Sequence, residues 1–129
     1  MQYMLLIYGS ESDWDRMPKA EQQKAFGEFM QFTSEIVASG HFKAGDPLEA
    51  TSTASTVRLR NGKLMTTDGP FAETKEQLGG YYLVEAANLD EAIGLAARIP
   101  SARWGSVEVR PVMTLEQRGN QARRTPEPR

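Results

Sequence analysis

The segment Asp68-Gly69-Pro70-Phe71-Ala72-Glu73-Thr74-Lys75-Glu76-Gln77-Leu78-Gly79-Gly80-Tyr81-Tyr82 combines turn-forming, charged and aromatic residues more densely than any other part of the chain. Its Gly-Pro and Gly-Gly pairs favour turns and bulges, so we expect a loop that joins two strands. Before the loop, residues 55–60 and 63–67 predict a β-hairpin, because Asn61-Gly62 between them is the preferred two-residue turn. After it, residues 81–87 predict a strand.

The remaining elements follow from periodicity. Residues 2–8 predict a strand that is apolar on both faces and therefore needs cover on both sides. Residues 18–39 predict a helix with one apolar stripe, formed by Phe26, Phe29, Met30, Thr33, Ile36 and Val37. Residues 41–48 are a short, ambiguous strand. A second helix is expected from the capping box of Asn88 and Glu91 to Pro100, followed by a strand over 106–112.

This order of elements predicts a ferredoxin-like α+β sandwich with an inserted hairpin. Two helices can cover only one face of such a sheet. The strands at 2–8 and 81–87 also carry apolar side chains for the other face, and an uncovered patch of that kind is rare in monomers. We therefore expect a homodimer in which two sheets pack face to face.

Composition sets the limits of the interpretation. With 129 residues the chain is expected to form one domain over 1–115, followed by a polar, disordered tail over 116–129. The formal net charge of −2 gives no basic field for nucleic acid. The chain has no cysteine, and its short opening apolar run neither spans a bilayer nor resembles a signal peptide. A cytoplasmic location without membrane contact is the expectation.

The central motif also carries a family resemblance. Asp68-Gly69-Pro70-Phe71 and the following residues to Tyr81 resemble the signature of the DGPF proteins, part of the YCII-related superfamily. Residues 3–8, 97–100 and 107–112 are similar to other parts of the family, so the resemblance covers about residues 1–112.

The resemblance implies a dimeric α+β barrel, a class that includes lactone isomerases and small dehalogenating or ring-processing enzymes. Genes for DGPF proteins often lie beside genes for extracytoplasmic-function sigma factors, which implies a stress or regulatory role. Better-studied YCII-like members have a His-Asp pair, with the histidine on the first helix. Here the predicted helix over 18–39 contains no histidine, so that pair is not assigned.

Three residues of the motif are candidates for chemistry. Asp68 enters the Gly-Pro turn and is either a general acid or base or the acceptor of an Asx-type turn. Glu73 is a second candidate for proton transfer, and Lys75 for binding an anionic substrate. The alternative for Glu73 and Lys75 is a solvated loop with weak surface pairs.

Three residues outside the charged loop are candidates for ligand binding. Tyr81 either packs in the core or dimer interface or presents its hydroxyl to a pocket. His41 has a free pKa near neutrality, but it follows a predicted helix, where a cation is favoured by the dipole alone. Arg110 alternates with Glu108 and is either part of an ion pair or a carboxylate clamp.

The sequence predicts neither a cofactor nor a metal. One histidine without cysteine makes a poor zinc site, and no phosphate loop, G-x-S-x-G elbow or H-E-x-x-H motif is present. Two hypotheses follow. The first is a homodimeric binding or regulatory protein for a small organic molecule. The second is a cofactor-free enzyme that transfers a proton on a lactone-like or other carbonyl substrate.

Overall fold

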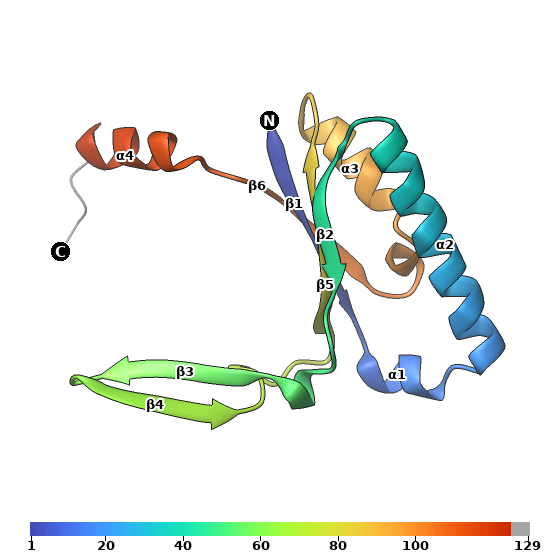
Figure 1. Cartoon of the computed structure of the whole chain (residues 1–129), viewed down its shortest axis with the longest axis horizontal. Helices are drawn as coiled ribbons and strands as arrows, with labels where there is room; N and C mark the ends of the chain where they lie inside the picture. Colours follow the sequence, from blue (N-terminus) through green and yellow to red (C-terminus); the bar gives the residue numbers. More distant parts are fainter. Residues whose placement is uncertain (125–129) are drawn as a thin grey trace.

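The computed structural model describes residues 1–124, which form six strands, four α-helices and two 3-10 turns (Figure 1). The strands are β1 (Gln2–Gly9), β2 (Phe42–Pro47), β3 (Ser55–Arg60), β4 (Lys63–Asp68), β5 (Gln77–Glu85) and β6 (Ser106–Pro111). The helices are α1 (Glu11–Arg16), α2 (Lys19–Ala38), α3 (Leu89–Ala97) and α4 (Leu115–Arg124), and the turns are η1 (Thr51–Thr53) and η2 (Pro100–Arg103).

A four-stranded antiparallel sheet with the order β2-β5-β1-β6 is the centre of the fold, and β3 and β4 form a separate hairpin. The predicted α+β class, with a hairpin inserted into it, is confirmed. The strand that is apolar on both faces, β1, lies inside the sheet between β5 and β6. The predicted turn at Asn61-Gly62 is also present, with positive φ at both residues.

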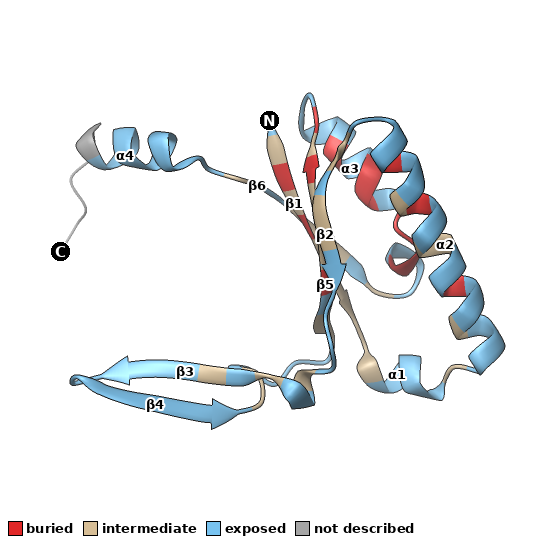
Figure 2. Cartoon of the chain, viewed as in Figure 1, coloured by how far each residue is buried: buried red, intermediate tan, exposed pale blue. Residues whose placement is uncertain are grey.

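The core lies between the sheet and helices α2 and α3 (Figure 2). Tyr3 and Leu5 of β1 and Val84 of β5 point to this side and pack against Phe32 and Ile36 of α2. The hydroxyl of Thr33 donates to the Phe29 carbonyl and also forms a hydrogen bond of 2.6 Å with the Tyr82 hydroxyl. Burial raises the pKa of Tyr82, and the bond to Thr33 partly offsets this effect.

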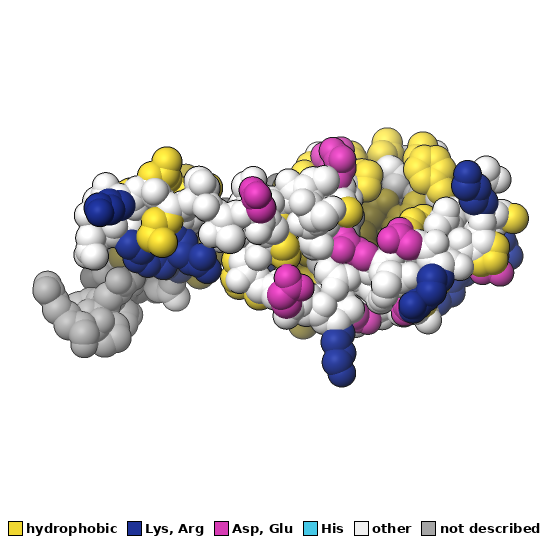
Figure 3. Space-filling view, turned by 90° about the horizontal axis from the view of Figure 1, so that it is seen from below, with side chains coloured by type: hydrophobic (Ala, Val, Ile, Leu, Met, Phe, Trp, Pro, Cys, Tyr) yellow, Lys and Arg dark blue, Asp and Glu magenta, His cyan; other side chains and the backbone are white. Residues whose placement is uncertain are grey.

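The predicted stripe of α2 is only partly correct. The buried positions are Ala25, Phe32 and Ile36, whereas Phe26, Met30 and Val37 are 62%, 55% and 55% exposed. The large apolar side chains form an arc wider than the strip that meets the sheet, so periodicity alone did not locate the buried face. Seen from below, hydrophobic side chains gather over the half of the molecule that carries the helices (Figure 3).

Two helices were not predicted, and both begin with a side-chain cap. Ser10 accepts a hydrogen bond from the Asp13 N–H at the start of α1. At the start of α4, Thr114 and Gln117 each accept a bond from the other's backbone N–H, which is a capping box. Helix α4 thus occupies most of the tail that we expected to be disordered, while residues 125–129 lie outside the described residues.

The edge strand β2 is irregular. Its register with β5 shifts between Phe42 and Ala44, so Lys43 lies in a bulge, and Pro47 ends the strand without an N–H. Gly45 lies against Tyr82, since a Cβ atom there would come within 2.7 Å of the tyrosine ring. These features weaken the free edge of β2 as a template for another strand.

The side of the sheet opposite α2 and α3, which we call the open face, is arranged differently. Only the hairpin and α4 project on this side, from opposite ends of the sheet, and both stand away from it (Figure 1). Alternation along β1, β5 and β6 points Met4, Leu6 and Leu83 to the open face. Within residues 1–124, no helix combines the length and the apolar character needed to cross a bilayer.

The core assignment can be tested with neighbouring residues of α2. Replacing the fully buried Ile36 with alanine leaves a cavity and should lower the free energy of unfolding by about 2–5 kcal/mol. The matched substitution Val37→Ala, at an exposed position, should change it by no more than about 0.5 kcal/mol. Urea unfolding followed by circular dichroism measures both. Equal losses would contradict the assigned buried face.

Candidate functional site

The open face has an apolar centre and polar edges. The strand register aligns Asp46, Tyr81, Leu6 and Glu108 in one row across the four strands. The adjacent row contains Ala44, Leu83, Met4 and Arg110. Neighbouring strands lie about 4.8 Å apart, so β5 and β6 are separated by about 10 Å across β1. The apolar centre therefore lies between two polar groups on strands about 10 Å apart.

One polar edge is formed by Tyr81 and Asp46. The Tyr81 hydroxyl donates to Asp46 Oδ2 over 3.3 Å, which is a long hydrogen bond. Tyr81 is half-buried, and Asp46 is exposed on the edge strand. Tyr81 is thus outside the core of its own subunit and on the open face, so its expected roles at a dimer interface or in a ligand site both stay predictions. Sequence reasoning missed Asp46, although its position opposite Tyr81 follows from antiparallel pairing of the two strands.

The other polar edge is formed by Arg110 and Glu108. The guanidinium donates through Nε at 2.8 Å, and through Nη2, to the same carboxylate oxygen of Glu108. This hydrogen bonding, together with the charge of Glu108, raises the pKa of Arg110 above its already high value. Arg110 is therefore a permanent cation at the edge of the open face. The ion pair lies within β6 and not across neighbouring strands, where the alternating pattern had placed it. The exposed side of the guanidinium remains accessible to an anion.

The charged loop of the central motif lies apart from this surface. Asp68, Glu73 and Lys75 are exposed, and none of the three side chains makes a hydrogen bond or ion pair with residues 1–122, whose side chains the structure describes. The turn is instead held through Gly69, whose φ is 98° and whose N–H donates to the Ala54 carbonyl at 2.7 Å. The Thr56 hydroxyl donates to the Gly69 carbonyl. The motif's best-supported task is therefore to connect the hairpin to the sheet.

Glu11 fixes the base of the hairpin from another part of the chain. Its carboxylate accepts bonds from the Thr51 N–H at 2.8 Å and the Thr51 hydroxyl at 2.7 Å. Its own N–H donates to the Gln77 side chain, at the start of β5. These contacts join α1, η1 and β5, so they set the direction in which the hairpin leaves the sheet.

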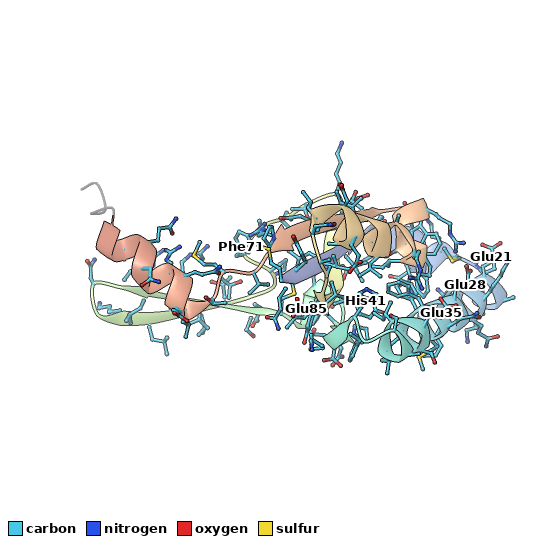
Figure 4. All side chains as sticks on the ribbon, turned by 90° about the horizontal axis from the view of Figure 1, so that it is seen from above. Glu21, Glu28, Glu35, His41, Phe71 and Glu85 are labelled. Atoms are coloured by element: carbon cyan, nitrogen blue, oxygen red, sulfur yellow. The ribbon has the colours of Figure 1, made fainter. Side chains whose placement is uncertain are left out.

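His41 lies at the opposite end of the sheet from the motif. Its Nδ1 is 2.6 Å from the Ser39 hydroxyl, and its Nε2 is 3.1 Å from Glu91 Oε1. These groups and Glu85 line an open cavity of about 290 Å³. Figure 4 labels His41 and Glu85. Ser39 also bonds the Ile36 carbonyl at the end of α2, where the helix dipole disfavours an alkoxide. The arrangement thus resembles a helix cap more than a nucleophile with its base.

Glu91 is held by local capping. It accepts a bond from the Ala87 N–H at 3.0 Å, and the Asn88 side chain accepts from the Glu91 N–H, as the sequence predicts for a helix start. The bond from Ala87 is the main reason why the pKa of Glu91 is lowered, and His41 contributes through its hydrogen bond and charge.

A second groove, of about 350 Å³, lies between α2 and η2. Its charges are already paired: Arg103 with Glu28 at 2.8 Å, and Arg98 with Glu35 at 3.0 Å. Figure 4 shows Glu21, Glu28 and Glu35 along α2. Among residues 1–124, no group of three or more His, Cys, Asp or Glu side chains is placed to hold a metal ion.

Comparison with known proteins places this geometry in context. The model of the YCII-related domain matches residues 1–116. An uncharacterised protein of Rhizobium meliloti (strain 1021) is 38% identical over 114 residues, which cover 87% of this chain and 92% of that protein.

A solved structure with a similar fold is the 5-chloro-2-hydroxyhydroquinone dehydrochlorinase of Burkholderia phenoliruptrix AC1100 in complex with 2,5-dihydroxybenzoquinone. The TM-score is 0.54 and the identity 12%, and the match covers 90% of this chain and 97% of the dehydrochlorinase. At this identity the likeness concerns the fold alone.

The lowered pKa of Glu91 predicts a pH effect on stability. Folding favours the ionised carboxylate, so its contribution is present above the ordinary pKa near 4.5 and is lost as the pH falls through the lower folded value. Glu91→Gln should therefore be less stable than the natural chain at pH 7, with a smaller difference at pH values below the folded pKa. Chemical unfolding across this range measures the effect, with Asp90→Asn as the control. A difference independent of pH would exclude this role of the Glu91 carboxylate.

Proposed function

The chain belongs to the YCII-related domain family, and from this premise we propose that it acts as a homodimer that binds a small organic molecule between the open faces of two sheets. The observation that supports this most directly is the open face itself. Its apolar centre of Met4, Leu6 and Leu83 is uncovered by any helix among residues 1–124. Packing against a second open face would remove this surface from water.

The ligand class follows from the groups around the apolar centre. Arg110 favours an acidic group such as a carboxylate, phenolate or enolate. Tyr81 and Asp46 favour a hydroxyl or carbonyl at the other side. A hydroxylated ring compound with an acidic group suits this arrangement. The dehydrochlorinase of similar fold is solved with such a compound, a dihydroxybenzoquinone, which makes that compound the first probe to use.

An enzymatic version of this proposal remains the alternative. Proton transfer by Asp68 or Glu73, with Lys75 holding an anion, is not favoured by their positions, since all three are exposed on a loop away from the apolar centre. Asp46, hydrogen-bonded to Tyr81, is the carboxylate that accompanies the apolar centre. If turnover is found, Asp46 is therefore the preferred general base.

Dimer formation is tested at the centre of the open face. Leu6→Glu places a charge where two apolar sheets would pack, and desolvation of that charge is unfavourable. We expect the natural chain to sediment as a dimer at micromolar concentration and Leu6→Glu as a folded monomer. Leu89→Glu, at an exposed position of α3 on the helical side, is the control and should remain dimeric. A monomeric natural chain would refute the proposal.

Ligand binding is tested by calorimetry with 2,5-dihydroxybenzoquinone as the probe. Binding to the native dimer should raise its melting temperature. Arg110→Ala should weaken binding about tenfold or more, because a charged hydrogen bond is worth about 1.5–3 kcal/mol. Tyr81→Phe should weaken it by a smaller factor.

Arg58→Ala, on the hairpin, removes a charge of the same sign away from the open face and should bind normally. Equal affinity of Arg110→Ala and Arg58→Ala would place the ligand elsewhere. Absence of any binding by the natural dimer would require a ligand of different chemistry and would refute the class proposed here.

A further inference from the structure

The β3–β4 hairpin has two unlike faces. The register pairs Leu59 with Leu64 and Val57 with Thr66, so Val57, Leu59 and Leu64 share one face. They are 61%, 64% and 71% exposed. The opposite face carries the basic side chains Arg58, Arg60 and Lys63. We call the first of these faces the apolar hairpin face. Viewed from below, hydrophobic and basic side chains are both visible on the projecting part (Figure 3).

The hairpin is firmly attached but lacks a packing partner within the described chain. Its base is held by the bond from the Gly69 N–H to Ala54 and by the contacts of Glu11 with Thr51. Beyond the base it is exposed almost throughout (Figure 2). An isolated two-stranded hairpin is at best marginally stable in water, so a second surface is needed to hold these strands together.

The direction and length of the hairpin indicate what that surface is. It leaves the end of the sheet on the side of the open face, the side on which a second sheet would pack (Figure 1). Each strand has six residues, which extend about 20 Å at 3.4 Å per residue. Packed sheets are only about 10 Å apart. The hairpin is therefore long enough to pass the partner's sheet and lie along the side of the partner subunit.

We infer that the hairpin is a dimer arm whose apolar face lies on a second copy of this chain. This inference rests on the proposed dimer and extends it, because two-fold symmetry gives each subunit one arm and one surface that receives the other arm. Phe71, 81% exposed just beyond β4, is placed at the base of the arm to join the same contact (Figure 4). The basic face of Arg58, Arg60 and Lys63 stays in water.

A negatively charged membrane is the competing occupant of an apolar and basic element. The structure favours the second copy, because the basic side chains lie on the face opposite the apolar one. A hairpin that inserts its apolar face into a bilayer would hold those charges away from the lipid headgroups.

The experiment uses two cross-strand pairs of the same hairpin. Leu59→Ser with Leu64→Ser removes the apolar face, whereas Arg58→Ser with Met65→Ser changes the directly opposed pair on the other face. We expect the dimer dissociation constant, from sedimentation, to rise at least about tenfold for the first variant. The second variant should change it by less than about threefold, since neither side chain lies in the proposed contact. Circular dichroism checks that both variants fold.

The outcomes separate the arm from the dimer. If the natural chain is a dimer and the two double variants have the same dimer dissociation constant, the inferred role of the hairpin as an arm is wrong. The open-face dimer is then unaffected. If the natural chain is monomeric, the proposed function fails first. Loss of binding to phosphatidylserine vesicles by the leucine variant, with unchanged dimerisation, would also overturn the inference in favour of a membrane.

A direct contact test is available because the chain has no cysteine. Leu64→Cys, labelled with a benzophenone maleimide, should give cross-linked dimers on irradiation. Arg58→Cys, labelled in the same way on the solvated face, should give few. Cross-linking efficiency that is equal at the two positions, or absent at Leu64→Cys in a dimeric sample, would contradict the arm.

Discussion

Strand β1 is apolar on both faces, and the helices of residues 1–124 cover only one of them. This imbalance underlies most of the architecture. Tyr3 and Leu5 fill the core with α2 and α3, whereas Met4 and Leu6 on alternate positions face the other way. An interior strand of this kind requires two layers of cover. One layer comes from the same chain, and the proposed dimer would supply the second, which is why that dimer and its ligand site depend on the same few side chains.

Much of the fold could be predicted from the sequence, because the local sequence patterns favoured the same elements that the fold contains. The Asn61-Gly62 turn, the Asn88 cap and the two-sided β1 each have one dominant physical cause, and all three are present. The buried face of α2 could not be predicted in the same way, because its apolar arc is wider than the strip that contacts the sheet. Only contact with the sheet selects Phe32 and Ile36 over Phe26. The signal for α4 was present in Thr114 and Gln117 but was masked by a polar composition.

The candidate site was less predictable than the fold. The concentration of charged residues in the motif directed the prediction to Asp68, Glu73 and Lys75. These residues are exposed, at the end of β4 and in the loop after it. The pairing of Asp46 with Tyr81 joins residues 35 positions apart and depends on the register of two strands. His41 illustrates the same limit, because its hydrogen bond to Glu91 joins residues 50 positions apart. This bond accounts for the position of the imidazole without a catalytic role. The motif therefore serves mainly as the connection between the sheet and the hairpin.

The irregular edge strand β2 has a consequence for how copies of this chain can assemble. Its bulge, Lys43 and the terminal Pro47 interrupt the ladder that an incoming strand would need. Growth of the sheet from edge to edge is thereby obstructed, so subunits cannot add one after another into an endless fibre through β2. The proposed face-to-face pairing would instead be closed after two subunits, so it would limit the size of the assembly even though the chain exposes apolar side chains on the hairpin.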